Sequence, residues 1–394
     1  MLYDALIIGA GPAGATTALL LAQAGWSVAI VEKKSFPRRK VCGEFISATS
    51  LPLLQKLGLA DRYLAEAGPE IKRVGLYAGK SIITANMPPN ENPSHQWGRA
   101  FGRDHLDTLL LEAAIAAGAH CWQPGEIQTL QRDNNISHCE ILSNNTTSTI
   151  TARTVILAHG SWERSLLSKP APEHKSADLL AFKAHFTNAN LATDLMPLIA
   201  FPGGYGGIVH TDGGKITLSC CIRRDALQKI RKRYQLAAAE AVLQHINDTC
   251  AGARNILQHA QRQGMWLAAG PIRPGIRKRY KNENFYVGNL TGEAHPIVAE
   301  GISMAMQSAW LLAEILIAHQ HEIIAGNNAN AGEVYAKRWR EHFTTRIAAA
   351  AVFAQFAMRP WLIKPMLPLF SYFPRLLSLA TKLSGKIKQV VPAN

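Results

Sequence analysis

The residues with the clearest capacity for chemistry lie near the start of the chain, in a glycine-rich turn. Gly9, Gly11 and Gly14 follow a short apolar run and precede an alanine- and leucine-rich stretch, Ala15–Ala24. In that order, such glycines permit a tight turn, let the backbone approach a phosphate, and allow a helix to pack closely on a strand. Free N–H groups at the start of the helix favour negative charge. The pattern predicts a pyrophosphate-binding turn; the alternative is a glycine turn of some other α/β fold.

An acidic residue completes this unit. The segment Ser27–Val31 has the composition of a second strand, and it ends on Glu32. A carboxylate at this place accepts hydrogen bonds from the ribose hydroxyls of a dinucleotide. Strand, glycine turn, helix, strand and acid together indicate a dinucleotide site, for which Ala13 and Lys33 are further candidates.

The turn at residues 9–14 (GAGPAG) and the segment at 36–47 (FPRRKVCGEFIS) resemble FAD enzymes of the p-hydroxybenzoate hydroxylase and geranylgeranyl reductase superfamily. The resemblance implies that Arg39 or Lys40 approaches the FAD phosphates, and that Cys42, Gly43 and Phe45 line the isoalloxazine region. It also makes Cys42 a candidate catalytic residue. The alternative for Cys42 is a small buried hydrophobic side chain.

Two segments in the middle of the chain extend the resemblance. Arg103 opens a predicted amphipathic helix that runs to about Ala117, and the superfamily's arginine at this place contacts FAD. The alternative is a surface arginine at a helix start. Residues 154–160 (TVILAHG) resemble the superfamily's second fingerprint, with His159 where an acid is usual; His159 is either catalytic or a structural histidine. The resemblance implies NAD(P)H as the electron donor.

The third signature covers Phe285–Ala309. Here Asn289 replaces the superfamily's acid and can still hydrogen-bond a ribityl hydroxyl. The backbone N–H groups of Gly301, Ile302 and Ser303 open a predicted helix. By resemblance, that helix points its N-terminus at the flavin edge where reduction builds negative charge.

The turn before this helix is unusually polar. It contains Glu293, His295 and Glu300 within eight residues. Beside Pro296, His295 is the candidate proton-handling catalytic residue. The alternative is that His295 only packs the turn.

The fold that the resemblance implies is α/β, with a Rossmann-like FAD-binding domain interleaved with an antiparallel β-sheet substrate domain. Strand-like runs between residues 178 and 223 favour that sheet. We expect the FAD-binding domain at 1–70, 99–175 and 276–325, the substrate domain at 71–98 and 176–275, and a helical C-terminal region at 326–394.

Charge and cysteine content limit the partners. The 394 residues carry a formal net charge of +14 and contain six cysteines. Their spacing includes no CxxC pair, which argues against a metal site or disulfides and fits a cytoplasmic location. No zinc-finger spacing or basic recognition helix indicates nucleic acid.

After Glu341 the chain has no acidic residue, while basic and apolar residues alternate. This tail predicts either peripheral membrane contact or a helical cap on the substrate domain. The basic residues concerned are Arg346, Arg359, Lys364, Arg375, Lys382, Lys386 and Lys388.

The resemblance favours three functions. The first is a monooxygenase that hydroxylates a hydrophobic aromatic small molecule, polyketide- or quinone-like, through a flavin C4a-hydroperoxide. The second is a reductase of isoprenoid double bonds. The third is a lipid-binding escort protein on the same fold, which would not need the flavin-side glycines. A halogenase fits less well, because the chain has no clear counterpart of that family's substrate-tunnel tryptophan motif.

Overall fold

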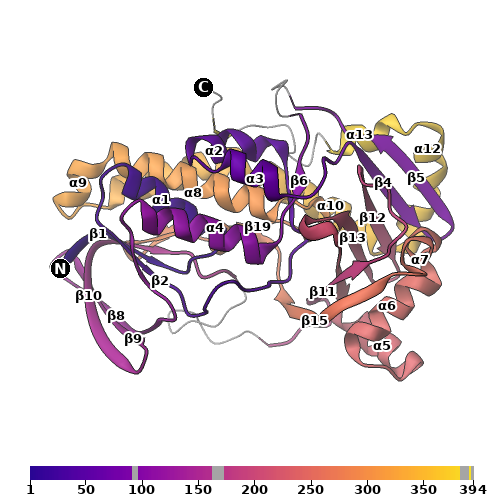
Figure 1. Ribbon diagram of the computed structural model, residues 1–394, viewed down its shortest axis with the longest axis horizontal. Coiled ribbons are helices and arrows are strands. Elements are labelled where there is room, and N and C mark those ends of the chain that lie inside the picture. Colours follow the sequence, from indigo (N-terminus) through magenta and orange to yellow (C-terminus); the bar gives the residue numbers. More distant parts are fainter. Residues whose placement is uncertain (91–95, 162–172, 382–389, 392–394) are drawn as a thin grey trace.

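A computed structural model describes residues 1–90, 96–161, 173–381 and 390–391. The fold is α/β and contains two large sheets that lie beside each other along the long axis of the molecule (Figure 1). One sheet is flanked by the long helices of the nucleotide-binding half. The other lies in the half that contains the predicted substrate side. C-terminal helices pack on the second half, at the end far from the N-terminus.

The first sheet has the strand order β17-β18-β10-β1-β2-β7, and β8 and β9 extend it from β10. The strands β10, β1, β2 and β7 run parallel, as the βαβ pattern predicts. Residues on both faces of β1 and β2 are buried, so these strands are almost entirely apolar. The strands are β1 (Leu2–Ile8), β2 (Val28–Val31), β7 (His120–Trp122), β8 (Glu126–Asp133), β9 (Ile136–Ser143), β10 (Thr146–Leu157), β17 (Tyr280–Lys281) and β18 (Asn284–Tyr286).

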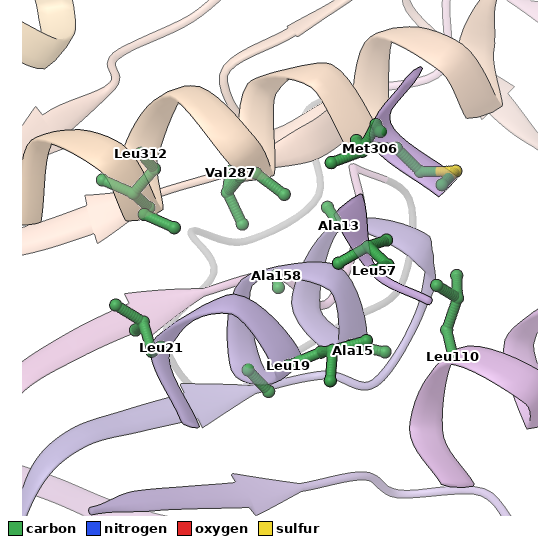
Figure 2. Packing of buried hydrophobic residues seen from close by; sticks show 14 of the residues in the cluster. Ala13, Ala15, Leu19, Leu21, Leu57, Leu110, Ala158, Val287, Met306 and Leu312 are labelled. Atoms are coloured by element: carbon green, nitrogen blue, oxygen red, sulfur yellow. The ribbon is translucent and has the colours of Figure 1, made fainter. Parts of the chain in front are cut away.

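Three helices cover one face of this sheet: α1 (Pro12–Gln23), α4 (Arg103–Ala116) and α8 (Gly301–Ala318). Figure 2 shows the apolar layer between α1 and α8, where Ala13 and Leu19 of α1 belong to the same buried cluster as Met306 and Leu312 of α8. Alanines on α1 let the neighbouring helices approach closely. By length and composition α8 is apolar enough to cross a membrane, but most of it is buried inside the protein as a core helix.

The second sheet has the order β15-β11-β14-β13-β12-β4-β5. Its neighbouring strands are antiparallel, as expected, except that β4 and β12 pair in parallel. Helices α5 (Arg224–Tyr234), α6 (Ala238–Thr249) and α7 (Ala251–Leu257) share a buried cluster with this sheet. The strands are β4 (Arg73–Ala78), β5 (Ser81–Asn86), β11 (Leu179–Thr187), β12 (Leu195–Phe201), β13 (Gly204–His210), β14 (Ile216–Arg223) and β15 (Gln261–Ile272).

The long helix α10 (Ala329–Ala357) joins the two halves. Near its start, the Tyr335 hydroxyl donates to the Tyr286 carbonyl of the first sheet at 3.1 Å. Near its end, Ala354 and Ala357 lie in a buried cluster with residues of the second sheet. Short helices precede and follow it: α9 (Gln320–Ile324), α11 (Pro360–Ile363), α12 (Leu367–Tyr372) and α13 (Arg375–Thr381).

Shorter elements connect the two halves. Two small sheets pair β3 (Phe45–Ile46) with β6 (Arg99–Ala100), and β16 (Gly275–Ile276) with β19 (Gly292–Glu293). Helices α2 (Leu51–Lys56) and α3 (Ala60–Glu66) follow β3 and pack into the apolar core of the first half. Both small sheets therefore lie where the chain crosses between the halves.

Candidate active site

The glycine turn between β1 and α1 forms one end of a large cavity. A Cβ on Gly9 would lie 2.7 Å from the backbone of His159, and one on Gly14 would lie 1.9 Å from the Gly9 carbonyl oxygen. These two glycines therefore serve packing. Gly11 faces the cavity, where a Cβ would meet only the Arg103 guanidinium, at 3.7 Å. The backbone next to the start of α1 is thus open to a ligand, as the phosphate-binding role of this turn requires.

Glu32 lies at the end of β2 and lines the cavity next to this turn. Its side chain is almost fully buried. One carboxylate oxygen accepts from the Ala10 N–H at 2.9 Å, and the other accepts from the Lys34 N–H at 2.9 Å. The acid is therefore fixed beside the turn, where a ribose would bind. Lys33 has a different place, because its exposed side chain pairs with Glu126.

The basic segment before Cys42 contributes Arg38 and Lys40 to the cavity wall. Arg38 also lies 3.4 Å from the Glu32 carboxylate. Of the two candidates for the phosphate contact, Lys40 lines the cavity. Arg39 instead pairs with Asp104 at 3.6 Å, and its side chain is 39% exposed. The structure therefore favours Arg38 and Lys40 over Arg39 for the cofactor phosphates.

Cys42, Gly43 and Phe45 all line the cavity. Beyond Gly43 a Cβ would project into open space. The Cys42 sulfur accepts from the Glu44 N–H at 3.4 Å and also interacts with the Arg103 guanidinium. The thiol therefore borders the cavity beside a fixed positive charge.

Arg103 stands at the first turn of α4, buried in the cavity wall across from Gly11. Its guanidinium makes a two-pronged ion pair with Asp107, with N···O distances of 2.6 and 2.7 Å. Burial alone would lower the pKa of Arg103, but the Asp107 carboxylate outweighs it and raises the pKa. Arg103 is thus a permanent, oriented cation rather than a surface arginine.

Glu44 is a site residue that the sequence did not reveal. Its carboxylate is fully buried and hydrogen-bonded to Lys183, to Thr217 and, at 3.0 Å, to the His185 ring. Burial alone would raise the pKa of Glu44, but the His185 hydrogen bond and the charges of Lys183 and His185 lower it to about 2. Lys183 and His185 lie two residues apart on β11 and hence on one face of the strand. Glu44 therefore links the segment at residues 36–47 to β11 of the second sheet.

The start of α8 forms the opposite wall of the cavity. Gly301 and Ile302 line it, and a Cβ on Gly301 would meet open space. Ser303 is fully buried, and its hydroxyl accepts from the Ser47 N–H at 3.1 Å, so its side chain serves packing. Asn289 lines the cavity and donates its amide to Glu293 at 3.2 Å. Ala299 adopts φ +53°, in the left-handed region that glycine adopts without strain.

His295 lies between the α8 end of the cavity and the second sheet. Its Nδ1 is 3.2 Å from the hydroxyl of Tyr205, which is buried on β13. Burial lowers the pKa of His295 to about 4, and burial also raises the pKa of Tyr205 well above its usual value. Both rings are therefore uncharged near neutral pH, and both line the cavity. Tyr205 lies in a glycine-rich run at residues 203–207, and no local pattern there indicates its contact with His295.

The second sheet supplies the apolar part of the cavity wall, chiefly from β11 to β14. Gly206 and Gly207 of β13 lie beside Tyr205, and a Cβ on Gly206 would lie 2.7 Å from the Ser219 carbonyl. The glycines therefore let β13 lie close against β14. The further sheet residues that line the cavity are Ala181, Met196, Leu198, Ile208, Val209, Cys220, Cys221, Ala269 and Ile272.

The walls fit an FAD that extends from the glycine turn to the second sheet. At Gly11, Gly43 and Gly301 the missing side chains leave the backbone open to the cavity at three separate places. Glu32 is positioned for the ribose, Arg38 and Arg103 supply positive charge, and Asn289 supplies an amide. In the described part of the chain, no group of three or more His, Cys, Asp or Glu residues could hold a metal ion.

A family model described as "FAD binding domain" matches residues 2–323. The chain belongs to this FAD-binding family. The proteins that match this chain include monooxygenases, halogenases and reductases.

Two curated relatives show how far the similarity extends. Conditioned medium factor receptor 1 of Dictyostelium discoideum is 25% identical over 345 residues, which cover 80% of this chain and 63% of that protein. Digeranylgeranylglycerophospholipid reductase of Picrophilus torridus is 30% identical over 160 residues, which cover 40% of this chain and 39% of that protein. The chain thus spans less than two thirds of either relative.

A solved structure confirms the fold over the whole chain. A myxobacterial chondrochloren halogenase superposes with a TM-score of 0.77 and 19% identity, covering 100% of this chain and 93% of the halogenase. At this identity the likeness concerns the fold alone. The architecture predicted from the sequence, a Rossmann-like FAD-binding half with an interleaved sheet and C-terminal helices, is confirmed.

Proposed function

We propose that the protein is an FAD-dependent monooxygenase that hydroxylates a hydrophobic aromatic molecule carrying a phenol-type hydroxyl. The observation that carries the proposal is the Tyr205–His295 hydrogen bond, which lies in the cavity between the start of α8 and the apolar sheet wall. An aromatic ring is activated for hydroxylation when its hydroxyl proton is drawn away. A neutral histidine next to a neutral tyrosine can accept a hydrogen bond from that hydroxyl and draw its proton partly away from the ring oxygen.

In this proposal, each part of the cavity wall has a separate role. Bound FAD supplies the electrons and the oxygen chemistry. The apolar residues of β11–β14 bind the substrate ring and exclude water. The Tyr205 hydroxyl and His295 Nδ1 orient the substrate hydroxyl and relay its proton. The backbone N–H groups at the start of α8, including that of Gly301, stabilise negative charge at the flavin edge.

A reductase of isoprenoid double bonds is the second candidate. Two observations favour it: the place of Cys42 in the cavity wall, and the name of the Picrophilus torridus relative. An apolar cavity would accept an isoprenoid chain as readily as an alkylated ring. The two reactions differ in their need for oxygen, since only hydroxylation transfers an oxygen atom to the product.

An isotope experiment separates them. The flavin-loaded protein, photoreduced without oxygen, is mixed with oxygen-18 gas and a panel of alkylphenols, and the products are analysed by mass spectrometry. We expect one oxygen-18 atom in the product, and a large loss of product in Tyr205→Phe. If no phenol gains oxygen while an isoprenoid substrate is reduced under nitrogen, the monooxygenase assignment fails and the reductase replaces it.

We propose NAD(P)H as the electron donor. Anaerobic addition of NADH or NADPH would then bleach the bound flavin. A flavin that stays oxidised with both nicotinamides, yet is reduced by dithionite, would point to a protein donor instead.

A further inference from the structure

The C-terminal helices expose an unusual group of large apolar side chains. Trp361 is 70% exposed, Tyr372 is 82% exposed and Phe373 is 61% exposed. Among the described residues, the exposed large hydrophobic side chains include no other aromatic residue. Leu369 and Leu379, in the same stretch of the chain, are exposed as well. We call these five residues the tail patch. Clustered apolar exposure of this kind marks an interaction surface rather than ordinary surface composition.

Folding does not account for the tail patch, because the same helices already have a buried apolar side. Ile363 and Leu367 pack into the cluster that contains the second sheet, and Leu377 packs into the neighbouring cluster. The Ser378 hydroxyl donates to the Asn86 carbonyl of β5 at 2.7 Å. Figure 1 shows α12 and α13, in yellow, on the outer side of β4 and β5. One side of these helices thus holds them on the sheet, and the other side faces outward.

The charge around the tail patch is positive. Lys364 and Arg375 are exposed between its members, and Arg359 is half-buried at the start of α11. No acidic residue follows Glu341 in the sequence. Three further basic residues of the tail, Lys382, Lys386 and Lys388, lie outside the described residues. Trp and Tyr with interspersed Lys and Arg favour the interface of a bilayer that contains anionic lipids.

A second cavity lies between the end of α10 and the candidate active site. Gln355, Met358 and Arg359, at the end of α10 and the start of the tail, line this cavity. Ile272 and His295 line it as well, and both also belong to the wall of the main cavity. The residues from which the tail begins are therefore close to the residue that we place beside the substrate.

We propose that α11–α13 dock the protein on an anionic lipid bilayer through the tail patch, with Lys364 and Arg375 at the headgroups. Trp361, Tyr372 and Phe373 enter the interfacial region, where their apolar rings leave water while the Trp361 N–H and the Tyr372 hydroxyl stay hydrated. A consequence that rests on the proposed function is that a lipophilic substrate dissolved in the bilayer is concentrated near the protein.

Vesicle sedimentation of the flavin-loaded full chain tests the docking without any substrate or turnover. We use vesicles of phosphatidylcholine alone and of phosphatidylcholine with phosphatidylglycerol, at low and high salt. The protein is expected to sediment with the anionic vesicles at low salt and to be released by salt. Trp361→Ser with Phe373→Ser should weaken this partition roughly tenfold or more, since two rings no longer insert. Lys364→Glu with Arg375→Glu should abolish the preference for anionic vesicles.

Met265→Ser is the matched control, because Met265 is 84% exposed but lies on β15, away from the tail. It should sediment like the unaltered protein, and the flavin absorbance of each variant reports that it has folded. Protein that stays in solution with both lipid mixtures overturns the proposal. So does a dimer in solution that Trp361→Ser converts to monomer without any vesicle binding, because the patch would then join two copies. Inactivity toward phenols leaves the docking result unaffected.

Discussion

Replacing Glu44 by glutamine tests the electrostatics of the site most directly. The carboxylate is 1% exposed and bonded to Lys183, His185 and Thr217. Its pKa falls from the ordinary 4.5 to about 2, because the hydrogen bond and the positive charges outweigh the effect of burial. That difference of about 2.5 pKa units corresponds to roughly 3 kcal/mol in favour of the folded, ionised form. Glu44→Gln should lower the free energy of unfolding by about this amount near neutral pH, since Lys183 keeps a buried charge without a counterion.

The assay is urea unfolding at saturating FAD, followed by circular dichroism over a range of pH. A carboxyl with a depressed pKa contributes stability above its unfolded pKa and loses that contribution as the pH falls through its folded pKa. The unaltered protein should therefore lose this stability between about pH 4.5 and pH 2. The free energy of unfolding of the Glu44→Gln variant should not show this loss over the same pH range.

Glu66→Gln is the control, because Glu66 makes an exposed ion pair with Arg62 one helical turn away. Its loss should leave the unfolding free energy nearly unchanged, because both side chains are exposed to solvent. If Glu44→Gln behaves like this control, or keeps the full acid dependence, the buried charge balance described for the second sheet is wrong.

Four further changes probe the cofactor site and its edge. Glu32→Ala should release FAD during gel filtration, because the ribose loses its acceptor; a variant that elutes fully yellow would refute the assignment. Gly301→Val should raise the Kd for FAD more than tenfold with little change in the Tm of the apoprotein, since its side chain projects into the cavity. Ala299→Gly should raise the unfolding free energy by about 0.5–1 kcal/mol, because glycine relieves a left-handed residue and offsets its own entropy cost. His295 should stay neutral down to about pH 4, so kcat/KM should show no acid limb near pH 6.5 from this group; a limb there that His295→Gln removes would contradict its depressed pKa.

The nucleotide half was predictable because its signals are local. Gly11 and Glu32 are fixed by a single strand–helix–strand unit, and Arg103 opens a helix whose period is visible in the sequence. The sequence could not distinguish Arg39 and Lys40, or indicate Arg38, because adjacent residues in an irregular segment point to different sides and no periodicity shows which side is inward. Their different partners appear only in the three-dimensional path of the segment.

Long-range partners could not be predicted in the same way. Lys183 lies 139 residues from Glu44, and the alternation along β11 indicates only that Lys183 and His185 share a face. Lysine is rarely buried without a partner, so the sequence favours that face as the exposed one. Tyr205 and His295 are 90 residues apart, and their contact depends on the approach of β13 to the turn before α8. Such contacts follow from the packing of the two halves and not from any local pattern.

The Glu44–Lys183 ion pair also constrains how the molecule moves. A hinge motion that separated residues 36–47 from β11 would pull the Glu44 carboxylate away from the Lys183 ammonium. It would also break the hydrogen bond between Glu44 and His185. Breaking a buried pair in this way costs about 3–5 kcal/mol, which makes the opened form a rare state. The two halves should therefore behave as one rigid body during turnover. Ligands would then enter and leave through side-chain rotation and the movement of short segments. The rate of ligand exchange should therefore respond little to solvent viscosity.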